Sequence, residues 1–193
     1  MRFITDFADQ AVVLPLVLVI GVTLLAQGWR RGAAAWAVAV CATFGTMLAL
    51  KLVFIACPAS LGASEVHTPS GHVAAAAVVA GGLAVLLLRR RHAALGVAVL
   101  AAVIIGVTRL ALREHTPAEV VIGAVLGLLG AWTLLALAGR PPPGVGVGRL
   151  SAVAIAVVVI FHGLHFPAEA QIRSSALRVA VMLAVCQPDE DRL

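Results

Sequence analysis

The strongest constraint on the fold of this chain is a series of long apolar runs separated by short polar segments. Hydrophobic residues make up 62% of the 193 residues, and charged residues only 12%. Runs long enough to cross the hydrocarbon core of a bilayer, repeated along one chain, are typical of polytopic helical membrane proteins. We therefore predict an all-α fold, a polytopic transmembrane helical bundle that forms a single membrane domain over residues 1–193.

The apolar runs predict about six membrane-spanning helices, over residues 12–27, 33–56, 69–88, 93–112, 117–138 and 150–166. Two of these helices are expected to begin at a proline that follows a capping threonine. The two pairs are Thr68-Pro69 and Thr116-Pro117. Threonine is a good helix cap, and proline fits the first helical position.

The other segments are expected to lie at or outside the membrane surfaces. Residues 1–10 carry Phe3 and Phe7 on one helical face, which predicts a short interfacial helix, with a frayed terminus as the alternative. Residues 139–149 include three consecutive prolines and predict a linker. Residues 168–186 mix apolar with charged residues and predict an amphipathic or partly inserted helix, or alternatively a seventh span. Residues 187–193 form a polar tail.

Counting the spans assigns the loops to two faces of the membrane. One face, which includes the linker 139–149, holds no acidic residue and the following arginines: Arg30, Arg31, Arg89, Arg90, Arg91, Arg140 and Arg149. Arginine-rich loops beside spans are cytoplasmic by the positive-inside rule, and tryptophans such as Trp29 are expected to anchor the interface. We therefore predict a bacterial-type inner (cytoplasmic) membrane protein whose remaining loops face the periplasm.

The basic balance of the chain follows from these loops. The sequence pI near 10.5 therefore indicates membrane orientation and no nucleic-acid partner. The three cysteines, Cys41, Cys57 and Cys186, have neither metal-site spacing nor an obvious disulfide framework. We expect no metal site and no cofactor, and membrane lipids as partners.

Two polar clusters fall on the predicted periplasmic face, one within residues 51–72 and one within residues 108–119 (TRLALREHTPAE). Charged groups near a bilayer are costly and usually mark a site. The candidate site residues lie at the ends of four spans: Lys51, Ser70, Gly71, His72, Arg109, His115 and Glu119. A lysine, an arginine and two helix N-termini can bind a phosphate, and two histidines can act as acid, base or nucleophile near neutral pH.

Each of these residues alone also has a structural explanation. Glu119 can reach back to Thr116 as a capping box, a role that does not exclude a catalytic one. Lys51 and Arg109 can be ordinary snorkelling side chains. His115 can be a histidine at a helix end. The combination on one face is more specific than any single member and favours a phosphate site.

The pattern resembles the three-part signature of the type 2 phosphatidic acid phosphatase (PAP2) family. The second part, Pro-Ser-Gly-His, is intact at residues 69–72. The third part is Ser-Arg, five residues, His, three residues, Asp, and here it reads Thr108-Arg109, LALRE, His115, TPA, Glu119. The first part is Lys, six residues, Arg-Pro, but here Lys51 is followed by LVFIA and Cys57-Pro58, which is one residue short and lacks the arginine.

The resemblance implies a four-helix core around the site, within residues 33–138, and a role for each matching residue. His115 would attack phosphorus and form a phosphohistidine, and Glu119 would orient His115. His72 would protonate the leaving oxygen. The phosphoryl oxygens would be bound by Lys51, Ser70, Gly71 and Arg109. The family's reaction would need no metal ion.

The missing arginine of the first part is expected to weaken transition-state stabilisation by about 3–4 kcal/mol, by analogy with the loss of one oxyanion-hole donor. Arg113 and His67 are the candidate substitutes. His67 is also a rival third histidine, because His67-Thr68-Pro69 repeats His115-Thr116-Pro117. Its structural alternative is a solvated loop residue.

The predicted function is that of an integral-membrane phosphatase for a lipid phosphate or diphosphate. The expected substrates are of the polyprenyl diphosphate, phosphatidylglycerol phosphate, phosphatidic acid or lipid A type. A lipid phosphotransferase with the same site is one alternative. A catalytically weak lipid-phosphate binder or transporter is another, and the missing arginine favours it.

Overall fold

The computed structural model describes residues 1–56, 66–88 and 93–183. Over these ranges the chain is helical and contains no strand. The order is α1 (Arg2–Thr5), η1 (Asp6–Ala8), α2 (Gln10–Ala26), α3 (Arg30–Ala56), α4 (Gly71–Leu87), α5 (Ala93–Ala111), α6 (Pro117–Leu137), α7 (Val147–Phe161) and α8 (Ala168–Leu183). The predicted all-α fold is confirmed.

Four segments of the described chain are long and apolar enough to cross a membrane: Arg2–Ala26, Arg30–Ile55, Ala93–Ala111 and Pro117–Leu137. The apolar helices α4 and α7 are shorter, with 17 and 15 residues. At 1.5 Å per residue they extend about 25 Å and about 22 Å, compared with about 30 Å for the hydrocarbon core. The protein is therefore a multi-pass helical membrane protein in which the central helix α4 is shorter than its neighbours.

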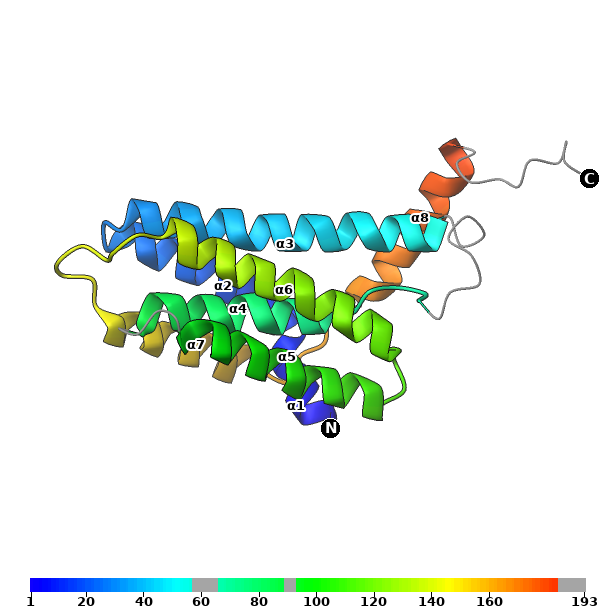
Figure 1. Ribbon diagram of the computed structural model, residues 1–193, viewed down its shortest axis with the longest axis horizontal. Helices are drawn as coiled ribbons and strands as arrows, with labels where there is room; N and C mark the ends of the chain where they lie inside the picture. The colour runs from blue at the N-terminus through cyan, green and yellow to red at the C-terminus, as the bar shows by residue number, and fades with distance from the viewer. Residues whose placement is uncertain (57–65, 89–92, 184–193) are drawn as a thin grey trace, which may run out of the picture.

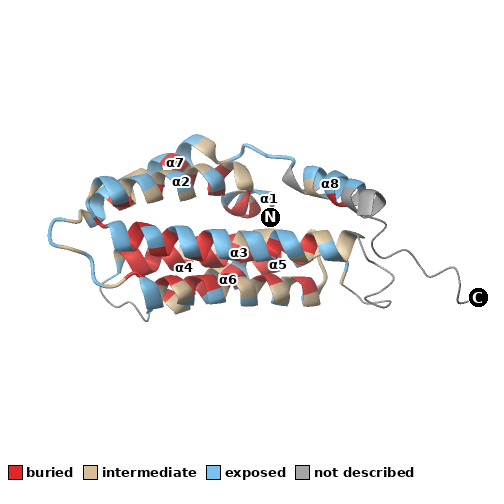
Figure 2. Cartoon of the chain, turned by 90° about the horizontal axis from the view of Figure 1, so that it is seen from above, coloured by how far each residue is buried: buried red, intermediate tan, exposed pale blue. Residues whose placement is uncertain are grey.

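The long helices run up and down side by side (Figure 1). The end of α3, the start of α4, the end of α5 and the start of α6 gather at one end of the bundle. The turn between α2 and α3 and the connection between α6 and α7 lie at the other end. Helices α2 and α7 form a second layer over α3–α6, and α8 leaves the bundle beside the end of α3 (Figure 2).

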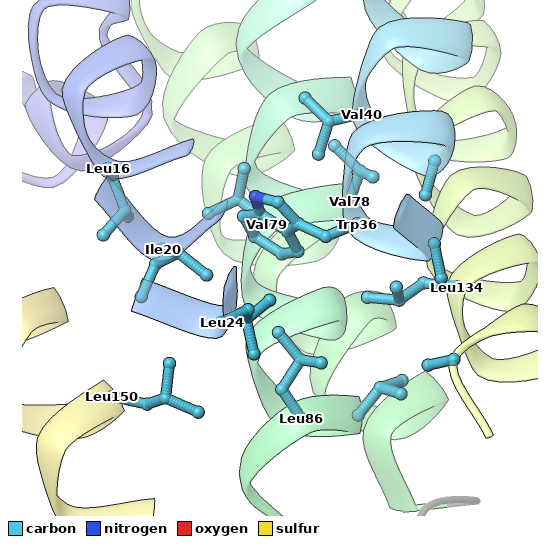
Figure 3. Packing of buried hydrophobic residues seen from close by; sticks show 14 of the residues in the cluster. Leu16, Ile20, Leu24, Trp36, Val40, Val78, Val79, Leu86, Leu134 and Leu150 are labelled. Carbon is cyan, nitrogen blue, oxygen red and sulfur yellow. The ribbon is translucent and has the colours of Figure 1, made fainter. Parts of the chain in front are cut away.

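The apolar core lies toward the end away from these helix starts, with Trp36 of α3 at its centre. Trp36 is 1% exposed and packs among Ile20 of α2 and Leu134 of α6 (Figure 3). Its indole N–H donates to the Val17 carbonyl at 2.9 Å. A Cβ at Gly82 would lie 2.7 Å from the Trp36 ring, so glycine at this position in α4 makes room for the indole.

Two expectations about α7 and the turn between α2 and α3 are wrong. Trp29 is 3% exposed and belongs to the core, whereas Trp132 is 57% exposed, so Trp29 stabilises the interior and is no interfacial anchor. The sixth predicted span was expected to reach residue 166, but α7 ends at Phe161. Gly163 has φ 85, in the left-handed region that favours glycine, and this backbone turn ends the helix.

Candidate active site

His115 and Glu119 form a hydrogen-bonded pair at the start of α6. His115 Nδ1 lies 2.8 Å from Glu119 Oε2, and the two side chains are only 7% and 4% exposed. The same oxygen accepts the Thr116 N–H at 3.0 Å, while the Thr116 hydroxyl accepts the Glu119 N–H at 3.4 Å. The predicted capping box is therefore confirmed, and the capping glutamate also binds the imidazole. Because His115 Nδ1 faces a carboxylate, Nδ1 donates to Glu119, and in the neutral imidazole Nε2 then holds the lone pair.

The second carboxylate oxygen of Glu119 binds the segment that precedes α4. Oε1 accepts the backbone N–H groups of His67 at 2.6 Å and of Thr68 at 2.8 Å. The Glu119 carbonyl accepts the Ser70 N–H at 3.1 Å. These bonds hold residues 67–70 outside the helix, so α4 begins at Gly71 with Ser70 as its N-cap. The prediction that Thr68 caps this helix and Pro69 opens it is therefore wrong.

Glycine residues on α6 allow the starts of α4 and α6 to touch. A Cβ at Gly123 would collide with the Ser70 carbonyl oxygen, and a Cβ at Gly127 would lie 2.6 Å from the Ala74 carbonyl oxygen. Small residues at such positions let two helix backbones approach closely within a membrane. The contact fixes Ser70 and the first turn of α4 beside the His115–Glu119 pair.

Lys51 extends from α3 to the first turn of α4. Its side chain is buried, and a Cβ at Gly71 would lie 3.5 Å from Lys51 Cε and 3.8 Å from Nζ. Ser70 is fully buried, and its hydroxyl has no hydrogen-bond partner within the described residues. A buried hydroxyl without a partner costs about 1–3 kcal/mol. The ammonium, this hydroxyl and the N–H groups of the first helical turn can together bind an anion.

Arg109 is positioned by the turn that joins α5 to α6. The N–H groups of Arg113 and Glu114 donate to the carbonyls of Leu110 at 3.0 Å and Arg109 at 3.1 Å, the pattern of a Schellman motif. Arg113 occupies the left-handed position of this motif, with φ 56. The Arg109 side chain is 11% exposed, and its guanidinium forms an ion pair with Glu114. The Glu114 carboxylate thus binds a guanidinium that could otherwise bind phosphate.

Thr108 connects the end of α5 to the N-terminal segment. The Thr5 hydroxyl donates to the Thr108 hydroxyl at 2.9 Å, and Thr108 donates to the Ile105 carbonyl at 2.7 Å. Both threonines are buried. Sequence reasoning missed this contact because it joins residues 103 positions apart, and neither threonine has a local pattern that predicts a partner.

His72 lies in a cavity of about 320 Å³, the His72 cavity, which combines polar residues such as Lys51 with a larger number of apolar ones, and which Gly71 also lines. Asp9 and Gln171 line the same cavity from the N-cap of α2 and from α8. Arg109, Asp9, Lys51 and the His115 imidazole lie near enough to His72 to act on it electrostatically. The structure therefore brings the predicted site residues of four helices together at one end of the bundle.

Asp9 is a cavity residue that sequence reasoning missed. Its Oδ1 accepts the N–H groups of Ala11 at 2.8 Å and of Phe166 at 3.2 Å. An acid in front of an apolar run signals a helix cap, which Asp9 is, but nothing in that signal predicts a position near His72. The bond to Phe166 also ties the connection between α7 and α8 to this side of the cavity.

The two candidate substitutes for the missing arginine have exposed side chains. His67 contributes its backbone N–H to Glu119, while its imidazole faces outward. Arg113 lies at the surface of the turn described above. The altered first part of the signature, Cys57-Pro58, lies outside the described residues. Within the described ranges, no three His, Cys, Asp or Glu side chains are grouped in a way that could hold a metal ion.

Comparison with known proteins gives one match. No curated protein and no solved structure matches the chain. The family model described as "PAP2 superfamily" matches residues 54–141, which run from the last turn of α3 to the segment after α6. This match contains the starts of α4 and α6 and the end of α5, where the site residues meet, and it supports a phosphatase-type activity on phosphate esters. The match over residues 54–141 supports membership of the PAP2 superfamily.

Proposed function

We propose that this protein is an integral-membrane phosphatase that hydrolyses a lipid phosphate or diphosphate through a phosphohistidine. The observation that carries the proposal is the His115–Glu119 pair, in which Nδ1 binds the carboxylate at 2.8 Å and Nε2 is left as the nucleophile. The pair lies beside the first turn of α4, close to Lys51 and Ser70. A nucleophile and an anion site are thus adjacent.

The reaction would proceed in two displacements at phosphorus. His115 Nε2 forms a bond to phosphorus while the bond to the leaving oxygen breaks, and His72 gives that oxygen a proton. Glu119 holds the Nδ1 proton and stabilises the positive charge that develops on the ring. Water then attacks phosphorus, His72 accepts its proton, and the P–N bond breaks to release phosphate.

The charge on the transferred phosphoryl group would be balanced by fixed donors. Lys51, the Ser70 hydroxyl, the Gly71 N–H and Arg109 are the groups proposed to bind its oxygens. Such preorganised donors supply most of the catalysis in phosphoryl transfer. The buried Ser70 hydroxyl would gain in the complex the hydrogen bond that it lacks in the described chain.

Under this proposal the site faces the periplasm of a bacterial-type inner membrane. The opposite end of the bundle carries Arg30 and Arg31 in the first turn of α3, and Arg140 and Arg149 around the connection from α6 to α7. Basic residues next to spans favour the cytoplasmic side. A reporter fused within residues 57–65 is expected to give a periplasmic signal, and a cytoplasmic signal would contradict this orientation.

A site at the membrane surface favours an amphiphilic substrate. We propose a polyprenyl diphosphate, phosphatidylglycerol phosphate, phosphatidic acid or a lipid A phosphate. The test is release of inorganic phosphate from a panel of these lipids by purified protein, with wild type beside His115→Ala. We expect His115→Ala to abolish release, and full activity in this variant would rule out the mechanism. Adding a second acceptor lipid and analysing the products separates hydrolysis from phosphotransfer.

His67→Ala is the matched control for this experiment. His67 stands in the same His-Thr-Pro context, but its imidazole is exposed and only its backbone N–H contacts Glu119. The alanine variant keeps that N–H, so we expect phosphate release close to that of the wild type. A loss equal to that of His115→Ala would assign His67 a catalytic role.

The ion pair between Arg109 and Glu114 favours a second candidate, a lipid-phosphate binder of low turnover. The Glu114 carboxylate competes with phosphate for the Arg109 guanidinium. Glu114→Gln removes the competing charge, so a hydrolase should show a lower KM for lipid phosphate. Tight lipid-phosphate binding without phosphate release, in both wild type and Glu114→Gln, would favour the binder.

A further inference from the structure

A second cavity, of about 300 Å³, lies beside the His72 cavity and is lined only by apolar side chains. We refer to it as the apolar groove. Its walls come from the N-terminal segment, α2, α4 and α5, and they include Phe7, Leu83 and Ile104. Phe7 is 46% exposed and Ile104 42% exposed, so the rim of the groove is open to the surroundings of the bundle.

The apolar groove adjoins the proposed phosphate site. Ala8 and Ala75 line both the groove and the His72 cavity, which Lys51 also lines. Ala75 lies three positions after His72 on α4, which is close to one helical turn. A molecule whose phosphate binds beside His72 therefore has the apolar groove next to it.

The groove runs along α4 from Ala75 to Leu83. At 1.5 Å per residue this stretch covers about 12 Å of a hydrocarbon core that is about 30 Å thick. Small side chains on two facing helices, Ala76 and Ala80 of α4 and Ala101 of α5, leave the space open. An apolar cavity of this kind does not hold ordered water, which needs polar partners. The volume and the apolar lining fit a single hydrocarbon chain.

We propose that the apolar groove binds one hydrocarbon chain of the lipid whose phosphate is hydrolysed beside His72. This inference rests on the proposed function and deepens it. It makes the enzyme prefer a lipid whose chain is long enough to fill the groove, because each methylene that packs against the groove walls adds dispersion contacts that a short chain cannot make. A short-chain phosphate ester would reach the same His72 and His115 but would leave the groove unfilled.

The test fills the groove and measures chain-length preference. Ala80→Leu and Ala101→Leu each add bulk inside it. The probes are phosphatidic acid with two palmitoyl chains and phosphatidic acid with two hexanoyl chains, both in mixed micelles of one detergent. We expect the wild type to prefer the palmitoyl lipid, and each variant to reduce the ratio of kcat/KM for the two lipids about tenfold, mainly through KM. An unchanged ratio in both variants would overturn the proposal.

Ala42→Leu is the matched control, because Ala42 is exposed on α3 and lines neither cavity. It introduces the same side chain at a lipid-facing position, and we expect the ratio to remain that of the wild type. Thermal unfolding of all three variants in detergent separates a binding effect from a folding defect. An equal change of the ratio in Ala42→Leu would assign the preference to the micelle and contradict the groove.

A second measurement does not depend on turnover. Phosphatidic acid with a diazirine in one chain is photo-crosslinked to the wild type, and the modified peptides are identified by mass spectrometry. We expect crosslinks in α4 and α5 around Ala80 and Ala101, and their loss in Ala80→Leu. Groove crosslinks without phosphate release from any lipid would support the groove and reject the phosphatase. Phosphate release without groove crosslinks would support the phosphatase and reject the groove as the binding site of the chain.

Discussion

The starts of α4 and α6 both follow the tripeptide His-Thr-Pro, at residues 67–69 and 115–117, yet the structure uses the two copies differently. At α6 the Thr116 hydroxyl caps the helix, Pro117 is its first residue, and the His115 imidazole binds Glu119. At α4 the tripeptide precedes the helix. There, His67 and Thr68 contribute only backbone N–H groups to Glu119, and the helix begins at Gly71.

The difference follows from the residue three positions after each threonine. After Thr116 this residue is Glu119, which completes a capping box, whereas after Thr68 it is Gly71, which has no side chain to reach back. Glu119 therefore binds both copies of the tripeptide. Its Oε2 accepts from the start of α6, and its Oε1 accepts from the segment before α4. One carboxylate accepts four hydrogen bonds and joins the nucleophile to the anion site.

The largest loss of phosphate release is expected from Glu119→Gln. This variant tests whether one carboxylate couples the starts of α4 and α6. An amide keeps the shape of the side chain but can no longer accept hydrogen bonds through both of its terminal atoms. His115 then loses its fixed tautomer, and the His67 and Thr68 N–H groups lose their common acceptor. By analogy with the Asp→Asn change in a catalytic triad, we expect kcat for phosphate release to fall by about 10³–10⁴-fold.

Glu119→Asp is the companion variant, because aspartate stands at this position in the family signature. It keeps the charge but shortens the side chain by one methylene, so it cannot reach both helix starts from the present backbone. An intermediate loss of phosphate release is expected. If Glu119→Gln retains activity within tenfold of the wild type, Glu119 is a structural cap and the two helix starts are not coupled in catalysis.

A smaller loss of phosphate release is expected from Gly123→Val, which would push the starts of α4 and α6 apart. The new side chain would meet the Ser70 carbonyl oxygen and push the first turn of α4 away from α6. Overpacking of this kind costs about 1–3 kcal/mol, and a displacement of about 1 Å at a site can lower the rate about 10²-fold. Thermal unfolding in detergent and phosphate release measure the two effects.

Gly45→Val is the control for this change. Gly45 lies in α3, and a Cβ there would meet no atom within 4 Å. The variant makes the same chemical change in a helix interior without a collision, so only the conformational preference of valine is tested. Similar losses in both variants would show that close approach at Gly123 does not position the site.

The fold and much of the site assembly could be predicted from the sequence. The patterns that indicate them lie within short stretches of residues or depend only on counting the membrane spans. Long apolar runs identify helices, and counting spans places the ends of α3 and α5 on the same face as the starts of α4 and α6. His115 and Glu119 lie four residues apart, so a helix brings them to one side. The structure confirms the capping box and brings His72, Lys51 and Arg109 near this pair.

The features that were missed depend on contacts between distant segments. Thr68 looks like a cap in sequence, but its N–H binds a carboxylate from another helix. Trp29 looks like an interfacial anchor, but it is buried in the apolar core. Asp9 reaches the cavity of His72 because the N-terminal segment folds back onto the site, where Thr5 binds Thr108. No pattern within a single run of residues specifies these partners.

Alanine substitutions of Thr116 and Thr68 are expected to lower the free energy of unfolding by different amounts. Thr116→Ala removes the hydroxyl that accepts the Glu119 N–H, and loss of such a cap costs about 1 kcal/mol. Thr68→Ala keeps the backbone N–H that Glu119 binds, so its effect should stay within about 0.5 kcal/mol, as for ordinary surface changes. Thermal unfolding of the two variants in one detergent gives the comparison. Equal losses would mean that the Thr68 hydroxyl also stabilises a helix start.

The smallest effect concerns the turn that leads into α6. Arg113 has φ 56, a left-handed conformation that costs a residue with a Cβ about 1–2 kcal/mol. Glycine avoids this cost, but it loses about 0.5–1 kcal/mol more in conformational entropy on folding. Arg113→Gly should therefore stabilise the protein by about 0.5 kcal/mol, which raises Tm by about 1–2 °C for a chain of this size. If Arg113 does not replace the missing arginine, phosphate release stays at the wild-type level. A variant that gains stability but loses activity tenfold or more would instead place the Arg113 guanidinium on the substrate phosphate, and would make the strained turn part of the binding site.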